Sequence, residues 1–138
     1  MHQHVLPTEP QEGAALLPPG AGLALIGSAM MIVGAFGPWI GGRFFGAMAG
    51  IDLGGDGWLV LGASLLALVS LLLPQASPLF RGTWVVAFAA GAGYVCWAHY
   101  NEAHADGVEV VWGLELAGIG CVLLGFAGLQ LVLTRSRS

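Results

Sequence analysis

Four long stretches of this chain contain no charged side chain, and this distribution constrains the fold more than any other feature of the sequence. Four Lys or Arg and eight Asp or Glu supply the charges of the 138 residues, and they leave residues 13–42, 57–80, 82–101 and 116–134 uncharged. An α-helix rises about 1.5 Å per residue, so roughly 17 to 25 apolar residues cross the hydrocarbon core of a bilayer. Each stretch is long enough, and the sequence therefore predicts four transmembrane helices.

The composition favours lipid over water as the surroundings of these helices. Hydrophobic residues make up 57% of the chain and charged residues 9%, against about 25% charged residues in a typical soluble domain. A helix on the surface of a soluble protein returns a polar residue every three or four positions, and the four stretches lack that return. We therefore expect an all-α membrane protein, folded as a four-transmembrane-helix antiparallel bundle.

The expected helices cover residues 22–40, 58–73, 83–100 and 110–133, within a transmembrane domain of residues 21–134. Residues 1–20 hold four of the seven prolines and few large apolar residues, which predicts a flexible cytoplasmic tail, and residues 135–138 form a second tail. The connection over 74–82 is short, so the second and third helices are expected to be antiparallel neighbours. A small outer hairpin over residues 43–53 is expected between the first two helices.

The arginines set the expected orientation. The positive-inside rule places the side with more Lys and Arg in the cytoplasm. Three arginines fall on the side of both chain ends and one on the other side: Arg81, Arg135 and Arg137 against Arg43. The chain has no lysine beside abundant Ala, Gly and Leu, which is typical of GC-rich bacterial genomes. We therefore expect a multi-pass plasma-membrane protein with both termini in the cytoplasm.

Aromatic residues mark the expected outer ends of the helices. Four tryptophans fall there: Trp39, Trp58, Trp97 and Trp112. An indole ring is favoured between acyl chains and headgroups, so we interpret these residues as an aromatic belt. An aromatic ligand cage is the alternative, and nothing in the spacing requires it.

Two acidic residues stand in a glycine-rich outer segment that leads into the second helix. Asp52 and Asp56 begin a calcium-loop pattern, but Ala63 stands where the bidentate glutamate should be. We therefore predict a tight turn, because the three glycines tolerate positive φ and Asp56 can bond the local backbone. The glycines are Gly54, Gly55 and Gly57. The outer-loop candidates for a binding role are Trp39, Asp52, Asp56 and Trp58.

Small residues mark the lines along which membrane helices pack, because they let two backbones approach closely. The fourth helix carries such a line at four-residue spacing: Gly113, Ala117, Cys121 and Gly125. Shorter lines are Gly20, Ala24 and Ser28 in the first helix, and Ala87 with Gly91 and Ala89 with Gly93 in the third. Contact within the bundle and contact with another chain both remain open. Cys96 and Cys121 fall inside helices and are interpreted as packing residues.

Glu115 is the most unusual candidate, because a carboxylate inside a hydrophobic helix is costly and such groups are commonly functional. If the fourth helix begins near Val110, Glu115 is only about 7 Å inside it, close enough to reach the interface. An interfacial role and a binding or proton-handling role are both open. Arg43, His99 and Tyr94 are the candidate partners.

The segment from His99 to Asp106 brings two histidines and two carboxylates together: His99, Glu102, His104 and Asp106. Such groups bind divalent metals, but histidines five positions apart do not share a helix face, so we favour a solvated acidic loop and expect no metal or cofactor. No catalytic constellation emerges from the remaining residues, and an enzyme is not expected. Four dispersed arginines make no nucleic-acid footprint.

Three short motifs carry a resemblance to a known group. Pro38-Trp39 ends the first helix, and Gly50-Ile51-Asp52 and Gly55-Asp56-Gly57-Trp58 lead into the second. Over residues 22–133 the chain resembles the small four-span membrane proteins of unassigned function from high-GC Gram-positive bacteria. The resemblance implies the topology and an outer loop, and it implies no mechanism.

The expected function is that of a non-enzymatic accessory or scaffold subunit, which binds other membrane proteins through its Gly/Ala-lined helices and outer loops. Its expected partners are the lipid bilayer and a membrane protein or further copies of itself. The alternative is a small transporter, channel or sensor subunit in which an oligomer gathers several Glu115 carboxylates. The first three expected helices contain no charge, which counts against a polar pathway.

Overall fold

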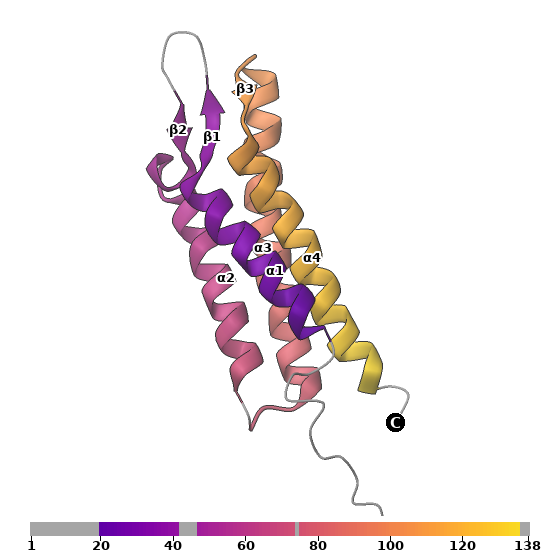
Figure 1. Ribbon diagram of the computed structural model, residues 1–138. Helices are drawn as coiled ribbons and strands as arrows, with labels where there is room; N and C mark the ends of the chain where they lie inside the picture. Colours follow the sequence, from indigo (N-terminus) through magenta and orange to yellow (C-terminus); the bar gives the residue numbers. More distant parts are fainter. Residues whose placement is uncertain (1–19, 42–46, 74, 136–138) are drawn as a thin grey trace, which may run out of the picture.

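The computed structural model describes residues 20–41, 47–73 and 75–135, and it is mostly helical. The four helices are α1 (Ala21–Phe36), α2 (Asp56–Leu72), α3 (Pro78–Ala105) and α4 (Trp112–Arg135). They lie side by side along one long axis (Figure 1). A small sheet of β1 (Pro38–Gly41), β2 (Met48–Ala49) and β3 (Glu109–Val110) lies at one end, with a 3-10 turn at Gly50–Asp52. We call this the sheet end, and the connection between α2 and α3 lies at the opposite end.

Helix α4 makes the most extensive contacts of the bundle, with α1 on one side and α3 on the other. Helix α2 packs against α1 and α3. The prediction that the second and third helices are neighbours is confirmed by these contacts.

Helix α1 ends four residues before the predicted Ile40, and the reason lies in Gly37 and Pro38. Gly37 is extended, with φ of −77° and ψ of 165°, as favoured for a residue that precedes proline. The chain then becomes the central strand of the sheet, with β1 antiparallel to both β2 and β3. The predicted hairpin over 43–53 is therefore confirmed only in part, because its first strand is Pro38–Gly41 and residues 42–46 lie outside the described residues.

Helix α3 is longer than the predicted 83–100 at both ends. It begins after Ser77, whose side chain accepts a hydrogen bond from the Phe80 amide at 3.2 Å, and Pro78 occupies the first turn. It ends in a Schellman motif, in which Gly107 has φ of 65° and the Val108 amide donates to the Ala103 carbonyl at 2.8 Å. The predicted acidic loop after Tyr100 is thus helical as far as Ala105.

The segments that precede α2 and α4 determine where these two helices begin. Gly54 and Gly55 have φ of 59° and 100°, as predicted, and they lead into α2 at Asp56. Gly57 lies inside α2, where a side chain would overlap the backbone of Gly50. Helix α4 begins at Trp112 rather than Val110, because residues 109–110 pair with β1.

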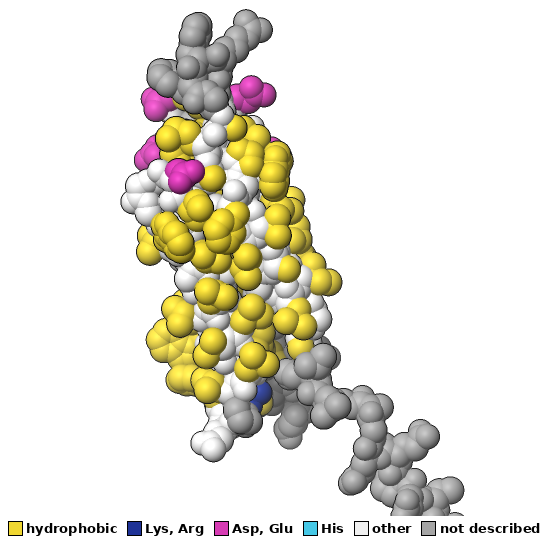
Figure 2. Space-filling view, turned by 60° about the vertical axis from the view of Figure 1, so that its left-hand side comes forward, with side chains coloured by type: hydrophobic (Ala, Val, Ile, Leu, Met, Phe, Trp, Pro, Cys, Tyr) yellow, Lys and Arg dark blue, Asp and Glu magenta, His cyan; other side chains and the backbone are white. Residues whose placement is uncertain are grey.

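The sides of the helices expose apolar residues along their length (Figure 2). Helices α3 and α4 are long and apolar enough to cross a membrane, and only 28% and 39% of their apolar segments are buried. The core helix of a soluble protein would be mostly buried. Helices α1 and α2 are equally free of charge in their interiors but shorter, with 16 and 17 residues.

The contact between α1 and α4 depends on small residues that recur every seven positions in both helices. Along the α1 side lie Gly20, Gly27 and Gly34, and along the α4 side lie Gly113, Gly120 and Ala127. A Cβ on Gly34 would lie 2.6 Å from the Ala117 amide nitrogen, and a Cβ on Gly27 would lie 2.9 Å from the Gly120 carbonyl oxygen. The two antiparallel backbones are therefore in direct contact over their shared length.

Charges are separated along the axis of the bundle. The described acidic residues all belong to segments at the sheet end: Asp52, Asp56, Glu102, Asp106, Glu109 and Glu115. The described arginines, Arg81 and Arg135, belong to the first turn of α3 and the end of α4, at the opposite end. Between these two zones the described helices carry no Asp, Glu, Lys or Arg.

Candidate functional site

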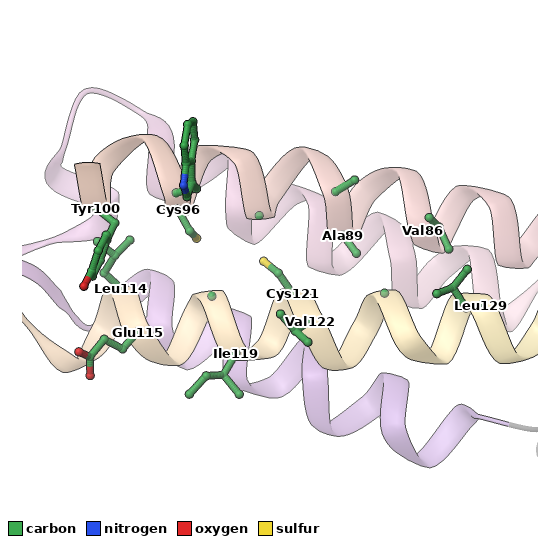
Figure 3. A pocket seen from close by; sticks show the side chains of 15 residues that line it. Val86, Ala89, Cys96, Tyr100, Leu114, Glu115, Ile119, Cys121, Val122 and Leu129 are labelled. Atoms are coloured by element: carbon green, nitrogen blue, oxygen red, sulfur yellow. The ribbon is translucent and has the colours of Figure 1, made fainter. Parts of the chain in front are cut away.

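An apolar groove of about 530 Å³ lies between α3 and α4 (Figure 3). Its walls extend from Val86 and Leu129 to Tyr100 and Glu115, over about 14 residues or roughly 21 Å of each helix. Its lining is almost entirely apolar, and Glu115 is the only charged residue among the described residues that form it.

The groove exists because α3 and α4 are closest near the opposite end and separate toward the middle. A Cβ on Gly128 would lie 3.0 Å from the Gly82 carbonyl oxygen, which is tight contact. Cβ atoms on Gly93 and Gly125 would lie 3.7 and 3.8 Å from Cys121 and Ala89, which is ordinary spacing, and one on Gly118 would meet nothing within 4 Å. The small residues of the middle turns therefore leave the groove open, and no side chain of the described residues fills it.

Glu115 lies at the sheet end of this groove, on the first turn of α4. Because α4 begins at Trp112, the carboxylate is only about 4.5 Å along the helix, less than the predicted 7 Å. The positive end of the helix dipole favours an acidic residue there. The side chain is exposed, and Trp97 and Tyr100 line the same groove.

Two of the three predicted partners of Glu115, His99 and Tyr94, make other contacts. His99 is engaged with Asp56. Tyr94 is 67% exposed and packs against Trp97, with ring centroids 6.1 Å apart. Arg43 lies outside the described residues. Glu115 therefore makes no hydrogen bond or ion pair with a described residue.

A second cluster surrounds Trp39 beneath the sheet. Trp39 was predicted to lie in an aromatic belt, but its side chain is fully buried and its Nε1–H donates to the Gly34 carbonyl at 2.8 Å. A Cβ on Gly50 would overlap the indole ring, so only glycine fits there. The other three belt tryptophans, Trp58, Trp97 and Trp112, are more than half exposed.

His99 joins this cluster to the start of α2. Its ring meets Trp39 edge to face with centroids 5.4 Å apart, and its Nε2 lies 2.6 Å from Oδ2 of Asp56. Its Nδ1 faces Oε2 of Glu102 at 3.7 Å. The expectation that Asp56 bonds its local backbone missed this long-range partner. Through the Nε2 contact with Asp56, His99 connects α3 to the start of α2.

The predicted packing line on α4 does not follow a single neighbour. Gly113 and Ala117 contact α1 through Gly37 and Gly34. Cys121 and Gly125 instead face α3, where Cys121 lies beside Cys96 (Figure 3). Residues four apart advance about 40° around a helix, so a line of four-residue steps moves from one neighbour to the next.

The remaining candidates stay at the surface. Asp52 is exposed on the 3-10 turn, and His104 is exposed and stacked on Tyr100 at 4.5 Å. The histidine and acidic side chains of the described segments form no group of three that could hold a metal ion. The prediction missed Gly34 and Gly50, whose close contacts depend on the tertiary fold.

Comparison with protein-family models, with curated proteins and with solved structures found no match. The resemblance to small four-span bacterial membrane proteins therefore stays a prediction, and function has to be argued from the site alone.

Proposed function

We propose that this chain crosses the bilayer four times and acts as a non-enzymatic accessory subunit, which binds a transmembrane helix of another membrane protein in the α3–α4 groove. The charge distribution supports the four spans, because the helices place their uncharged lengths between an acidic end and an arginine end. The positive-inside rule then puts Arg81 and Arg135 in the cytoplasm and the sheet end outside.

Helices α1 and α2 reach across the bilayer together with the segments at their ends. At about 1.5 Å per residue they are about 24 and 26 Å long, a few ångströms less than the hydrocarbon core. The exposed Trp58 at the start of α2 suits an interface. A bilayer adjusts to such a mismatch by local thinning at a modest cost.

The observation that carries the accessory role is the groove itself. Helix association in lipid depends on shape and on small residues, since apolar surface gains little by leaving lipid for protein. The groove offers both, with a long concave surface over Gly93, Gly118 and Gly125. The side chains of a partner helix would fill the space that the chain leaves open.

A photo-crosslinking experiment tests this proposal in native membranes. A photoreactive residue replaces Ile119, which lines the groove, or Val69, an exposed residue of α2 outside it. We expect a discrete protein adduct from position 119 and only lipid adducts from position 69. Gly118→Leu should abolish the adduct, because its side chain enters the groove without a clash in the fold.

The matched control is Gly91→Leu, which makes the same change at an open position of α3 outside the groove lining. It should leave the adduct unchanged. Lipid adducts alone at position 119 would contradict the accessory role. Ion or solute flux through the purified protein in liposomes, lost in Glu115→Gln, would instead support the transporter alternative.

A further inference from the structure

We infer that the partner helix carries a lysine or arginine near its outer end, which pairs with Glu115 when the helix lies in the groove. This inference rests on the proposed function and adds the chemistry of the partner. It starts from the position of Glu115, the only charge among the groove residues, at the end of an otherwise apolar surface.

A docked helix would remove water and lipid headgroups from Glu115. A buried carboxylate without a partner is costly, so burial of Glu115 would weaken the binding of a purely apolar helix in the groove. A cation at the same depth removes the penalty and adds a charge-assisted hydrogen bond. Trp97 and Tyr100 line the same end of the groove and offer aromatic surface to the carbon stem or the charge of a Lys or Arg side chain.

The described charged residues at the sheet end have the same sign as Glu115. Glu109 lies just before α4, and Glu102 and Asp106 lie at the end of α3. No described residue at this end is a Lys or Arg. The electrostatic complement of this end is a basic segment, which would also speed the encounter of the two proteins.

A second copy of the chain is a poorer occupant. In the same orientation it would bring a second acidic end to the same depth, while its described arginines, Arg81 and Arg135, would lie at the opposite end. Like charges that meet at the same depth of an interface repel each other and disfavour association. The described part of the chain therefore favours a partner of different sequence.

The experiment uses the full chain, fused at one end to a fluorescent protein, in phosphatidylcholine vesicles. The probe is an acceptor-labelled Leu/Ala transmembrane peptide with one lysine at its outer end, and its control peptide has glutamine there. Energy transfer reports binding. We expect the lysine peptide to bind about tenfold more tightly than the glutamine peptide, which corresponds to about 1.4 kcal/mol.

The variants separate this inference from the proposed function. Glu115→Gln should remove the preference for lysine and keep the binding of the glutamine peptide. Gly118→Leu should weaken both peptides, and Gly91→Leu neither. Equal binding of both peptides to the native chain would overturn the cationic partner and leave the groove as a helix site.

Three other outcomes would exclude a cationic helix of another protein as the occupant of the groove. Absence of binding by either peptide would overturn both the inference and the helix site. Displacement of the lysine peptide by phosphatidylethanolamine would assign the site to an amine lipid. Energy transfer between two copies of the chain that is lost in Gly118→Leu would assign the groove to self-association.

Discussion

Nε2 of His99 and Oδ2 of Asp56 lie 2.6 Å apart, so a pair of residues 43 positions apart in the sequence fastens the end of α3 to the first turn of α2. Asp56 is also favoured where it stands, because the first turn of a helix attracts negative charge. The pair thereby positions the His99 ring, which packs edge to face against the buried Trp39.

Replacing either partner should destabilise the sheet end. His99→Gln and Asp56→Asn should each lower the free energy of unfolding by about 1 kcal/mol, since the Asp56 side chain is 42% exposed and solvent screens the pair. Unfolding in mixed micelles by increasing SDS measures this loss. The double variant should lose less than the sum of the two, and strictly additive losses would contradict a direct interaction.

Gly34→Ala should separate α1 from α4. The new methyl group would lie 2.6 Å from the Ala117 nitrogen and 2.7 Å from the Gly113 oxygen, which are backbone atoms that cannot rotate away. We expect a loss of about 1–3 kcal/mol in the same unfolding assay. Gly22→Ala is the matched control, because nothing lies within 4 Å of its Cβ, and it should be neutral or stabilising.

Gly50→Ala should disrupt the pocket of Trp39, because a methyl group there would overlap the indole ring. The expected result is increased Trp39 exposure, seen as stronger quenching of tryptophan fluorescence by acrylamide. Gly54→Ala changes a nearby glycine with open space around it and tests only the cost of positive φ. Adding Trp39→Leu to Gly50→Ala should recover part of the lost stability, and no recovery would argue against the steric explanation.

Cys96 and Cys121 should form an intramolecular cross-link under oxidising conditions, because their side chains lie next to each other between α3 and α4. Mild copper-phenanthroline treatment should protect both thiols from a maleimide reagent added after denaturation, and reduction should restore the labelling. Gly125→Leu, which thickens the same interface, should slow the cross-link. Full labelling after oxidation would show that the two helices pack in another register.

The orientation makes a prediction for intact cells. In a background of Cys96→Ala and Cys121→Ala, a cysteine replacing the exposed Asp106 should react with a membrane-impermeant maleimide. A cysteine replacing the exposed Gln75 should react only after the cells are opened. Labelling of both positions from outside would contradict an intact membrane-spanning fold, and the reverse pattern would invert the orientation.

The sequence predicted the number of helices and the neighbour relation of α2 and α3, since uncharged length and short connections are local properties. The sequence also contains signals for both ends of α3 that the prediction did not use. Ser77-Pro78 is a helix start, and Asp106-Gly107 a helix end, so the full extent of α3 was present in the chain. The seven-residue spacing from Gly20 to Gly34 is also present in the sequence, whereas the predicted packing lines use steps of four.

Other features depend on tertiary contacts that no local pattern carries. A tryptophan at a helix end fits an interfacial belt as well as a buried pocket. Trp39 is buried because Gly50 and His99 pack against its ring, and these contacts form only in the folded chain. The pairing of His99 with Asp56 likewise requires the ends of two helices to meet. The groove arises from the divergence of α3 and α4, which the sequence of either helix alone does not determine.

The glycine contact between α1 and α4 has a consequence for biosynthesis. Helix α1 is synthesised before α4, so in the proposed four-span arrangement the backbone surface at Gly27 and Gly34 first faces lipid or the insertion machinery. This helix pair can then assemble only after the last helix has entered the membrane.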